Sequence, residues 1–225
     1  MTYGLKIRND AGDIQIDATY RNLQIVAEGT DTFSSAGLVD VFVDISFGAI
    51  ADPPIICVRS PSGPLGLVRM LLDGSGNYVG ARLIGLAFGS YGFDWFIAAP
   101  GTASAETWGM RVYTDAGQVA FDSGRRYLRV TDVVRLTSTI VNDPGSYDGE
   151  GYITLTHAAN AGAYYMLGRG WLAEGEGGPV IYLPSYRATD STHVSIAQLE
   201  RGSIAVPSSY PSFDDVYVVV CDKTP

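Results

Sequence analysis

The side chains that most often transfer protons in enzymes are scarce in this chain. Only two histidines, His157 and His193, occur among its 225 residues. A Ser-His-Asp triad would need one of them beside an activated serine, but no G-x-S-x-G turn marks such a serine. His157 follows a strand-like run and is interpreted as a surface or capping residue. The histidines therefore do not indicate nucleophilic catalysis.

Paired carboxylates could serve a glycosidase, in which one acid protonates the leaving group and the other acts as nucleophile or base. Asp214 and Asp215 lie in a turn before a strand, and Glu174 and Glu176 lie in a glycine-rich loop. Neither setting has the rigid, partly apolar character that separates the pKa values of two carboxyl groups. The carboxylates therefore give little support to a hydrolase.

Metal ligands are also poorly represented. The loop 142–151 carries oxygen ligands suited to calcium, but their spacing differs from the EF-hand pattern. These ligands are Asn142, Asp143, Asp148 and Glu150. No Cys-x-x-Cys motif or Cys/His cluster offers a zinc site. We expect no bound metal, no cofactor and no enzymatic activity.

The two cysteines lie one in each half of the chain, and each follows a run of aliphatic residues. Cys57 stands in Ile-Ile-Cys-Val and Cys221 in Val-Val-Val-Cys. Such settings are typical of buried free thiols. A bridge between the halves is the alternative, which sequence alone leaves open because it depends on geometry.

Aromatic side chains are the best candidates for binding, because exposed rings stack on sugars or bury in protein interfaces. Trp95 and Trp108 stand in strand patterns and are interpreted as core residues. Five other aromatic residues fall within one 23-residue window and predict a contact surface, with a core position as the equal alternative. They are Tyr164, Tyr165, Trp171, Tyr182 and Tyr186.

Charge excludes several partner classes. The net charge is −9, whereas nucleic-acid backbones and anionic membranes select clustered Lys and Arg. The first residues lack the basic segment and apolar core of a signal peptide, and no apolar run reaches the length of a membrane span. We therefore expect no nucleic-acid partner, no membrane insertion and synthesis in a cytoplasm.

A duplicated stretch organises the elements that must position these residues. Residues 3–26 align without a gap to residues 108–131, each position shifted by 105. Seven pairs of residues are identical, and most of the other pairs keep their apolar or polar character, so the match indicates an internal duplication. The identical pairs are Gly4/Gly109, Asp10/Asp115, Ala11/Ala116, Gly12/Gly117, Asp17/Asp122, Arg21/Arg126 and Leu23/Leu128.

Each copy of the repeat reads as a β-meander. Apolar and polar residues alternate on both sides of an Asp-Ala-Gly corner, as in strands that bury one face. The corner predicts a type I turn followed by glycine in the left-handed region, which glycine enters without a steric penalty. The turn residues are Asp10 and Gly12 in one copy, and Asp115 and Gly117 in the other.

The rest of the chain also reads as short strands separated by turn residues, without a sustained helical period. Strands at this spacing are typical of sandwiches and barrels. The repeat spacing places a boundary near residue 104, where a small polar linker occurs. We predict an all-β protein with two tandem β-sandwich-like domains, residues 1–104 and 105–225, each opened by the duplicated meander.

The repeated motif resembles a known family. The N-terminal Y-G-L-K-I-R-N-D-A-G and the V-x-x-D-A-G-x-V-x-F-D-S-x-x-R-x-L-R-V of residues 112–130 are similar to tail-tip and tail-fibre proteins of long-tailed bacteriophages, especially those of Pseudomonas. The resemblance covers the two repeat copies and implies a component of the distal tail in the virion. It also implies a homo-oligomer, often a trimer, that contacts other tail proteins, with a host-cell receptor or glycan as a further partner.

Two other functions compete with this expectation. A carbohydrate-binding module would use the aromatic window of the second half, and Trp171 would then be essential for binding sugar. A glycan hydrolase of the same tail would need a catalytic pair of carboxylates. The resemblance carries no catalytic residues over, because the matching positions are turn and core residues.

Overall fold

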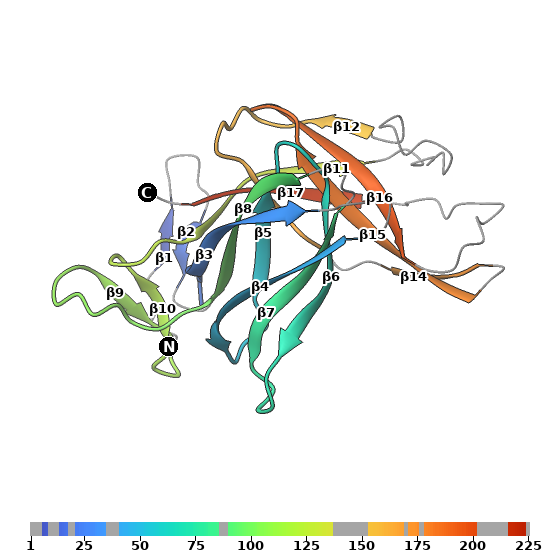
Figure 1. Ribbon diagram of the computed structural model, residues 1–225. Coiled ribbons are helices and arrows are strands. Elements are labelled where there is room, and N and C mark those ends of the chain that lie inside the picture. The colour runs from blue at the N-terminus through green and yellow to red at the C-terminus, as the bar shows by residue number, and fades with distance from the viewer. Residues whose placement is uncertain are drawn as a thin grey trace.

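The computed structural model is built from strands throughout the part of the chain that it describes, and the predicted all-β class is confirmed (Figure 1). The structure describes residues 6–8, 14–17, 21–34, 41–85, 90–136, 153–168, 171–175, 178–201 and 216–223. The strands of the first half are β1 (Lys6–Arg8), β2 (Ile14–Asp17), β3 (Leu23–Ser34), β4 (Val41–Ile50), β5 (Ile55–Arg59), β6 (Leu65–Leu72), β7 (Tyr78–Gly85) and β8 (Ser90–Pro100). Those of the second half are β9 (Arg111–Tyr113), β10 (Val119–Asp122), β11 (Leu128–Leu136), β12 (Ile153–Thr156), β13 (Tyr164–Met166), β14 (Trp171–Gly175), β15 (Gly178–Ala188), β16 (His193–Arg201) and β17 (Val216–Lys223).

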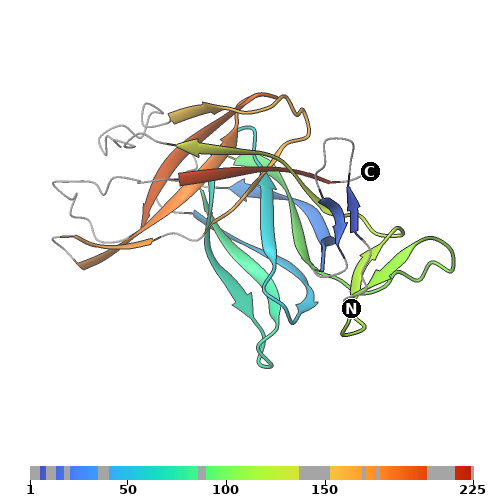
Figure 2. The same cartoon turned by 180° about the vertical axis from the view of Figure 1, so that it is seen from behind.

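Two antiparallel sheets form a sandwich. One has six strands in the order β11, β17, β13, β5, β8, β3, and the other has the order β12, β16, β15, β6, β7, β4, with β14 added to β15. The hairpins β1–β2 and β9–β10 lie together at one end of the molecule, and β14 lies at the opposite end (Figures 1 and 2). The sandwich therefore has two distinct ends.

The central part of the six-stranded sheet is buried on both faces. In β8, Phe93, Trp95 and Ile97 pack into the main core, with Phe33 and Tyr165 among its other members. Side chains on the opposite face of the same sheet form a second, smaller cluster. Its buried members are Cys57, Phe96, Ala98, Tyr164 and Cys221. Burial on both faces explains why β8 and β17 are continuous apolar runs in the sequence and do not alternate cleanly.

The duplication is repeated in the backbone. The hairpins β1–β2 and β9–β10 have bounds that differ by 105 at each end, and Lys6 faces Asp17 as Arg111 faces Asp122. Each hairpin contains a register irregularity. The third strands also begin 105 residues apart. The two copies of the repeat therefore adopt the same local fold.

The order of strands in both sheets is that of a two-fold rotation. Numbered within its own half, each sheet has the same three strands twice, in opposite order: β3, β8, β5 correspond to β11, β17, β13, and β4, β7, β6 correspond to β12, β16, β15. Strand β14 has no counterpart among the described residues of the first half. The two halves thus join edge to edge in both sheets.

The register of the strand pairs places the two-fold axis at particular residues. Cys57 faces Met166 where β5 meets β13, and Leu65 faces Tyr186 where β6 meets β15. Members of each pair occupy equivalent positions in the two halves, as a two-fold axis requires. The register partners that establish the equivalence are Ile55 with Ala98, Tyr164 with Cys221, Leu65 with Gly85, and Tyr186 with Ile196.

The outer strands β3 and β11 also meet at their beginnings. Gln24 and Tyr127 form an isolated antiparallel bridge, and the Ile25 backbone N–H donates to the Arg126 carbonyl at 2.9 Å. The six-stranded sheet is therefore drawn together at the end that carries the hairpins. Strands of both halves share each sheet, so the boundary near residue 104 separates two repeats and not two sheets. Whether each half folds independently stays a prediction.

Candidate interaction surface

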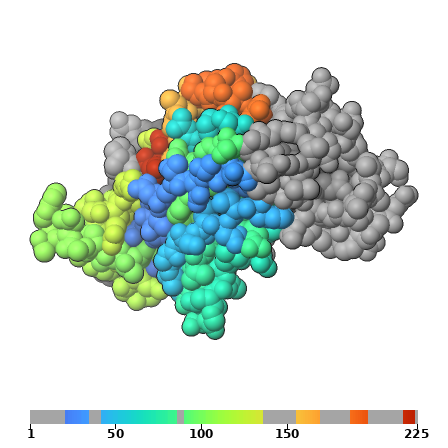
Figure 3. Space-filling model, in the orientation of Figure 1, coloured from blue at the N-terminus to red at the C-terminus, as the bar shows by residue number. Residues whose placement is uncertain are grey.

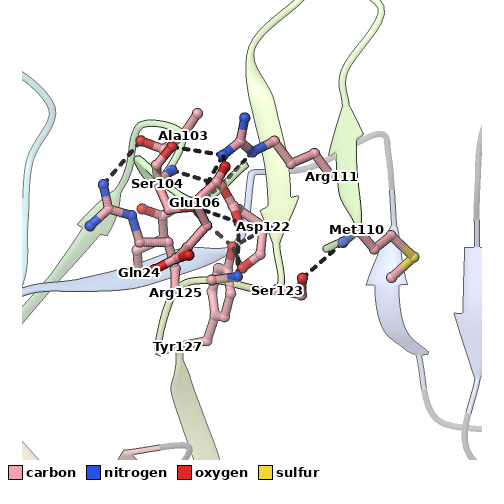
Figure 4. A network of polar contacts seen from close by, with 11 residues as sticks. Gln24, Ala103, Ser104, Glu106, Met110, Arg111, Asp122, Ser123, Arg125 and Tyr127 are labelled. Carbon is pink, nitrogen blue, oxygen red and sulfur yellow. Dashed lines mark hydrogen bonds and ion pairs between the residues drawn. The ribbon is translucent and has the colours of Figure 1, made fainter. Parts of the chain in front are cut away.

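Asp122 anchors the hairpin β9–β10 to the linker that precedes it (Figure 4). Its carboxylate accepts hydrogen bonds from the backbone N–H of Ser104 at 2.7 Å and of Gly124 at 2.8 Å. Arg111, its register partner, donates from Nε at 2.8 Å and also holds the linker carbonyls of Ser104 and Glu106 at 2.7 and 2.6 Å. One carboxylate and one guanidinium thus fix both the hairpin and the linker.

The charge of Asp122 is stabilised although its side chain is only 3% exposed. Burial by itself raises the pKa of this carboxyl group. The Ser104 and Gly124 N–H groups and the Arg111 guanidinium outweigh that effect and lower the pKa to about 2. The network explains why an aspartate stands at this position in the second repeat.

Tyr127 connects the same network to the first half of the chain. Its hydroxyl accepts from the Asp122 N–H at 2.5 Å, and the Gln24 side-chain amide donates to it at 3.4 Å. The ring stacks on Phe121 with centroids 5.0 Å apart. The Asn22 side chain and backbone N–H both donate to the Ala120 carbonyl. The hairpin is therefore fixed to the body of the protein.

Three large apolar side chains on or beside this anchored hairpin are exposed. Trp108, Met110 and Tyr113 are 81%, 40% and 51% exposed, whereas Val112 and Ala120 are buried beneath. The hairpin projects from the body in the space-filling view, as the lime-green lobe on the left (Figure 3). We call Trp108, Met110 and Tyr113 the hairpin surface. Exposed aromatic side chains on a rigid support are typical of protein interfaces.

Trp108 is a correction to the sequence analysis, which placed it in the core with Trp95. Trp95 is indeed buried, at 7% exposure. Trp108 precedes the short strand β9, and Gly109 between them has φ of +117°, a conformation that L-residues rarely adopt. A Cβ at Gly109 would approach the Ser123 hydroxyl to 2.4 Å. This glycine, which is identical in both repeats, separates Trp108 from the strand that follows.

The aromatic window predicted as a contact surface is largely interior. Tyr164, Tyr165 and Tyr186 are 7%, 1% and 3% exposed, so they belong to the cores. Trp171 and Tyr182 are register partners on the β14–β15 hairpin, and their side chains lie outside the described part. Alternation within a strand did not place these tyrosines outside, because β13 and β15 are covered on the relevant faces.

The turn of the second repeat has the geometry that its Asp-Ala-Gly corner predicts. Gly117 has φ of +75°, and its N–H donates to the Thr114 carbonyl at 2.9 Å. Asp115 is exposed at the tip of the turn. The corresponding residues of the first repeat, Asp10 and Gly12, lie outside the described residues.

The two cysteines are free and fully buried. Strand β13 separates them, because Cys57 faces Met166 on one side and Cys221 faces Tyr164 on the other. Strands two apart lie about 9.5 Å from each other, beyond the Cα separation of about 7 Å that a disulfide tolerates. Burial raises the pKa of the Cys57 thiol, and the nearby Cys221 thiol raises it further. The geometry favours two unbridged thiols.

We expect neither thiol to react with an aromatic disulfide reagent in the native protein, since reaction needs an exposed thiolate. Two equivalents should react after unfolding in guanidinium chloride. The measurement is the absorbance of the released thiolate with and without denaturant. Reaction of a thiol in the native protein within minutes would contradict the buried placement. Absence of reactive thiols after unfolding would indicate a disulfide bridge.

Metal-binding clusters of His, Cys, Asp and Glu are not found in the described residues. No group of three or more His, Cys, Asp or Glu side chains that could hold a metal ion occurs there. His157, interpreted from sequence as a surface or capping residue, is instead 5% exposed. His193 binds the adjacent Asp190 carboxylate at 2.8 Å. The side chains of Glu174, Glu176, Asp214 and Asp215 and the loop 142–151 lie outside the described part.

Comparison with known proteins found no family model, no curated protein and no solved structure that matches this chain. Among the residues that the structure describes, no helix has the length and apolar character required to cross a membrane. The hairpin surface is therefore assigned from its own geometry, as three exposed apolar side chains on or beside an anchored element.

Proposed function

We propose that this chain is a structural component of a bacteriophage tail tip or baseplate. The observation that carries the proposal is the duplicated hairpin unit, whose motif resembles tail-tip and tail-fibre proteins. The unit stands at the start of both halves of the chain, and strands of the two halves pair in both sheets of the sandwich. Its second copy is held rigidly by Asp122 and Arg111. A rigid β scaffold with an apolar projection suits a part that must dock onto others.

The assembly role is placed above host attachment within this proposal. Proteins that assemble into particles bury apolar side chains against their neighbours, and obligate interfaces are more apolar than transient ones. The hairpin surface offers such side chains. Other tail proteins and further copies of this chain are the proposed partners, and a host receptor or glycan is a further partner if the chain lies at the distal end.

The alternative, a carbohydrate-binding module, has weaker support. It depended on the aromatic window, and Tyr164, Tyr165 and Tyr186 of that window are buried. Trp171 and Tyr182 are the remaining residues of the window, and a sugar site there would require Trp171. Loss of glycan binding in Trp171→Ala, with binding retained in Trp108→Ala, would favour the alternative.

The test is to look for the chain in virus particles. Particles released from a bacterial culture that carries the gene are purified on a density gradient and analysed by mass spectrometry, and antibodies against the chain are located by electron microscopy. We expect the chain to co-purify with particles in a fixed ratio to the other tail proteins, with label at one end of the tail. Particles that lack the chain would overturn the proposal.

A gene-disrupted culture serves as the control. Without the chain, we expect headed particles with absent or incomplete tails. Complete and infectious particles from the disrupted culture would show that the chain is dispensable for the tail.

A further inference from the structure

We propose that the sulfur atoms of Cys57, Cys221 and Met166 form a binding site for a soft metal ion, Cu(I). The site lies in the smaller of the two core clusters of the six-stranded sheet, on the face opposite to the main core. It is independent of the proposed function, because it concerns the folded chain alone and does not require membership of a tail.

The register of the sheet brings the three sulfur-bearing side chains to one face. Cys57 faces Met166 where β5 meets β13, and Cys221 faces Tyr164 where β17 meets β13. Tyr164 and Met166 are two residues apart in one strand, so their side chains lie on the same face. The chain has two cysteines and four methionines, so half of its sulfur-bearing residues belong to this cluster.

The six-stranded sheet curls around the cluster. A flat sheet with strands about 4.8 Å apart would hold its two outer strands about 24 Å from each other. The outer strands β3 and β11 instead meet at Gln24 and Tyr127. Ile25 of β3 and Leu128 of β11 both pack against the cluster, and the four strands between them supply its other members. The two thiols therefore point into the interior of a curl, where side chains converge.

The two thiols interact inside this curl. Both cysteines are fully buried. Burial raises the pKa of the Cys57 thiol well above its ordinary value, and a hydrogen bond with the Cys221 thiol raises it further. A disulfide needs sulfur atoms about 2 Å apart, whereas two metal–sulfur bonds of about 2.3 Å place them about 4.6 Å apart. A metal ion can therefore bridge two thiols whose strands are too far apart for a disulfide.

The donor set selects the metal. Thiolate and thioether sulfur are soft ligands that suit Cu(I), whereas a structural zinc ion takes four ligands, mostly from Cys and His. Among the described residues, no histidine or carboxylate joins the two thiols in a group of three. Two thiolates with the thioether of Met166 are therefore too few for zinc and sufficient for Cu(I).

The charge beside the cluster is opposite to that of the metal complex. Cu(I) forms a bond to each cysteine sulfur, two protons leave to solvent, and no electron is transferred, so the complex carries one negative charge. The Lys223 ammonium lies 4.9 Å from the centroid of the Tyr164 ring and 2.9 Å from the Glu28 carboxylate. Arg126 bonds the same carboxylate. Two cations with one carboxylate give a net charge of +1, which favours a nearby anionic complex.

The test titrates the reduced, full-length chain without oxygen against Cu(I) held by the coloured chelator bicinchoninate, whose absorbance measures the copper that the protein withdraws. We expect the wild type to withdraw one Cu(I) ion per chain, and Cys57→Ser and Cys221→Ser to lose this uptake. Met166→Leu should weaken the affinity at least tenfold. Met110→Leu is the matched control, because its thioether is 40% exposed and lies outside the cluster, and it should bind as the wild type does.

Circular dichroism shows whether each variant folds, and Met166→Leu keeps the test decisive if a cysteine variant does not. X-ray absorption at the copper edge should show sulfur neighbours only. A wild type that leaves the copper with the chelator would overturn the proposal, as would full uptake by the folded cysteine variants. Unchanged affinity in folded Met166→Leu would overturn the three-sulfur site. Copper uptake accompanied by loss of the native spectrum would also overturn the proposal, because the ligands would then be thiols of the unfolded chain.

Discussion

Asp122→Asn is expected to lower the free energy of unfolding by about 3 kcal/mol, the cost of breaking a buried ion pair by removing one partner. The asparagine side chain keeps the shape of aspartate but loses the charge that holds Arg111 at 2.8 Å. Its amide nitrogen is also a donor in a site that already receives donors from Ser104 and Gly124. Chemical unfolding in guanidinium chloride measures the change.

The matched control is Asp115→Asn, on the exposed turn of the same hairpin. We expect a change within about 0.5 kcal/mol, as for other surface substitutions. Limited proteolysis should also cut the linker around Ser104 faster in Asp122→Asn than in the control. Equal stabilities of the two variants would show that the Asp122 network does not anchor the hairpin.

The effect of Asp122 should depend on pH. A carboxyl group whose pKa is lowered by folding stabilises the folded state fully above its unfolded pKa of about 4. That stabilisation is lost as the pH falls through about 2, the folded value. The difference between the wild type and Asp122→Asn should therefore be constant above about pH 5 and shrink between about pH 4 and about pH 2. A difference that grows in acid would contradict the lowered pKa.

His157→Ile is expected to destabilise the protein by about 2 kcal/mol, because it leaves a buried hydroxyl without its partner. His157 Nδ1 lies 2.8 Å from the Ala158 carbonyl, which can only accept, so this nitrogen carries the hydrogen. In neutral His157, Nε2 then accepts from the Tyr165 hydroxyl at 2.9 Å. Burial also raises the pKa of Tyr165 to about 12, so the hydroxyl keeps its proton at neutral pH.

The two-fold arrangement supplies a template for this substitution. Ile45 faces Ala81 in β7, and the His157 N–H bonds the Thr192 carbonyl at the equivalent place beside β16. The first half therefore has an apolar side chain where the second half has a hydrogen-bonded imidazole. Isoleucine occupies that position in one half, and the main expected loss at His157 comes from the hydroxyl of Tyr165 that is left without its acceptor.

A double-mutant cycle with Tyr165→Phe separates these causes. Tyr165→Phe alone removes the donor to Nε2 and should cost about 1–3 kcal/mol. The double variant leaves neither polar group unpaired, so its loss should be smaller than the sum of the single losses by about 1–2 kcal/mol. Additive losses would show that the hydrogen bond contributes nothing beyond packing.

Local structure was accessible from the sequence because it is encoded locally. The alternation of Leu5 to Ile7 and the glycine of each corner predicted the hairpins, and the shift of 105 is reproduced in their strand bounds. Long apolar runs such as β8 were recognised as strands without knowing their neighbours. These predictions needed only the period of two and the conformational preference of glycine.

Long-range pairing was not accessible in the same way. Nothing near Cys57 or Met166 indicates that β5 and β13 meet, because the contact joins residues more than 100 positions apart. The sequence left the position of the buried tyrosines open for the same reason, since burial of Tyr165 depends on a sheet that its own strand does not specify. The exposure of Trp108 was missed because the sequence does not show where a short strand such as β9 begins, and Trp108 lies before it.

The axis positions have a consequence for how the core can change. In a dimer of identical half-chains, the residue on the axis would meet itself, so each substitution there would alter the core volume by two side chains at once. The fused chain sets Leu65 against Tyr186 and Cys57 against Met166, a small residue against a larger one in each case. Because both halves lie in one chain, a substitution at the contact between them can change the packed volume by one side chain, whereas strict symmetry would change it by two.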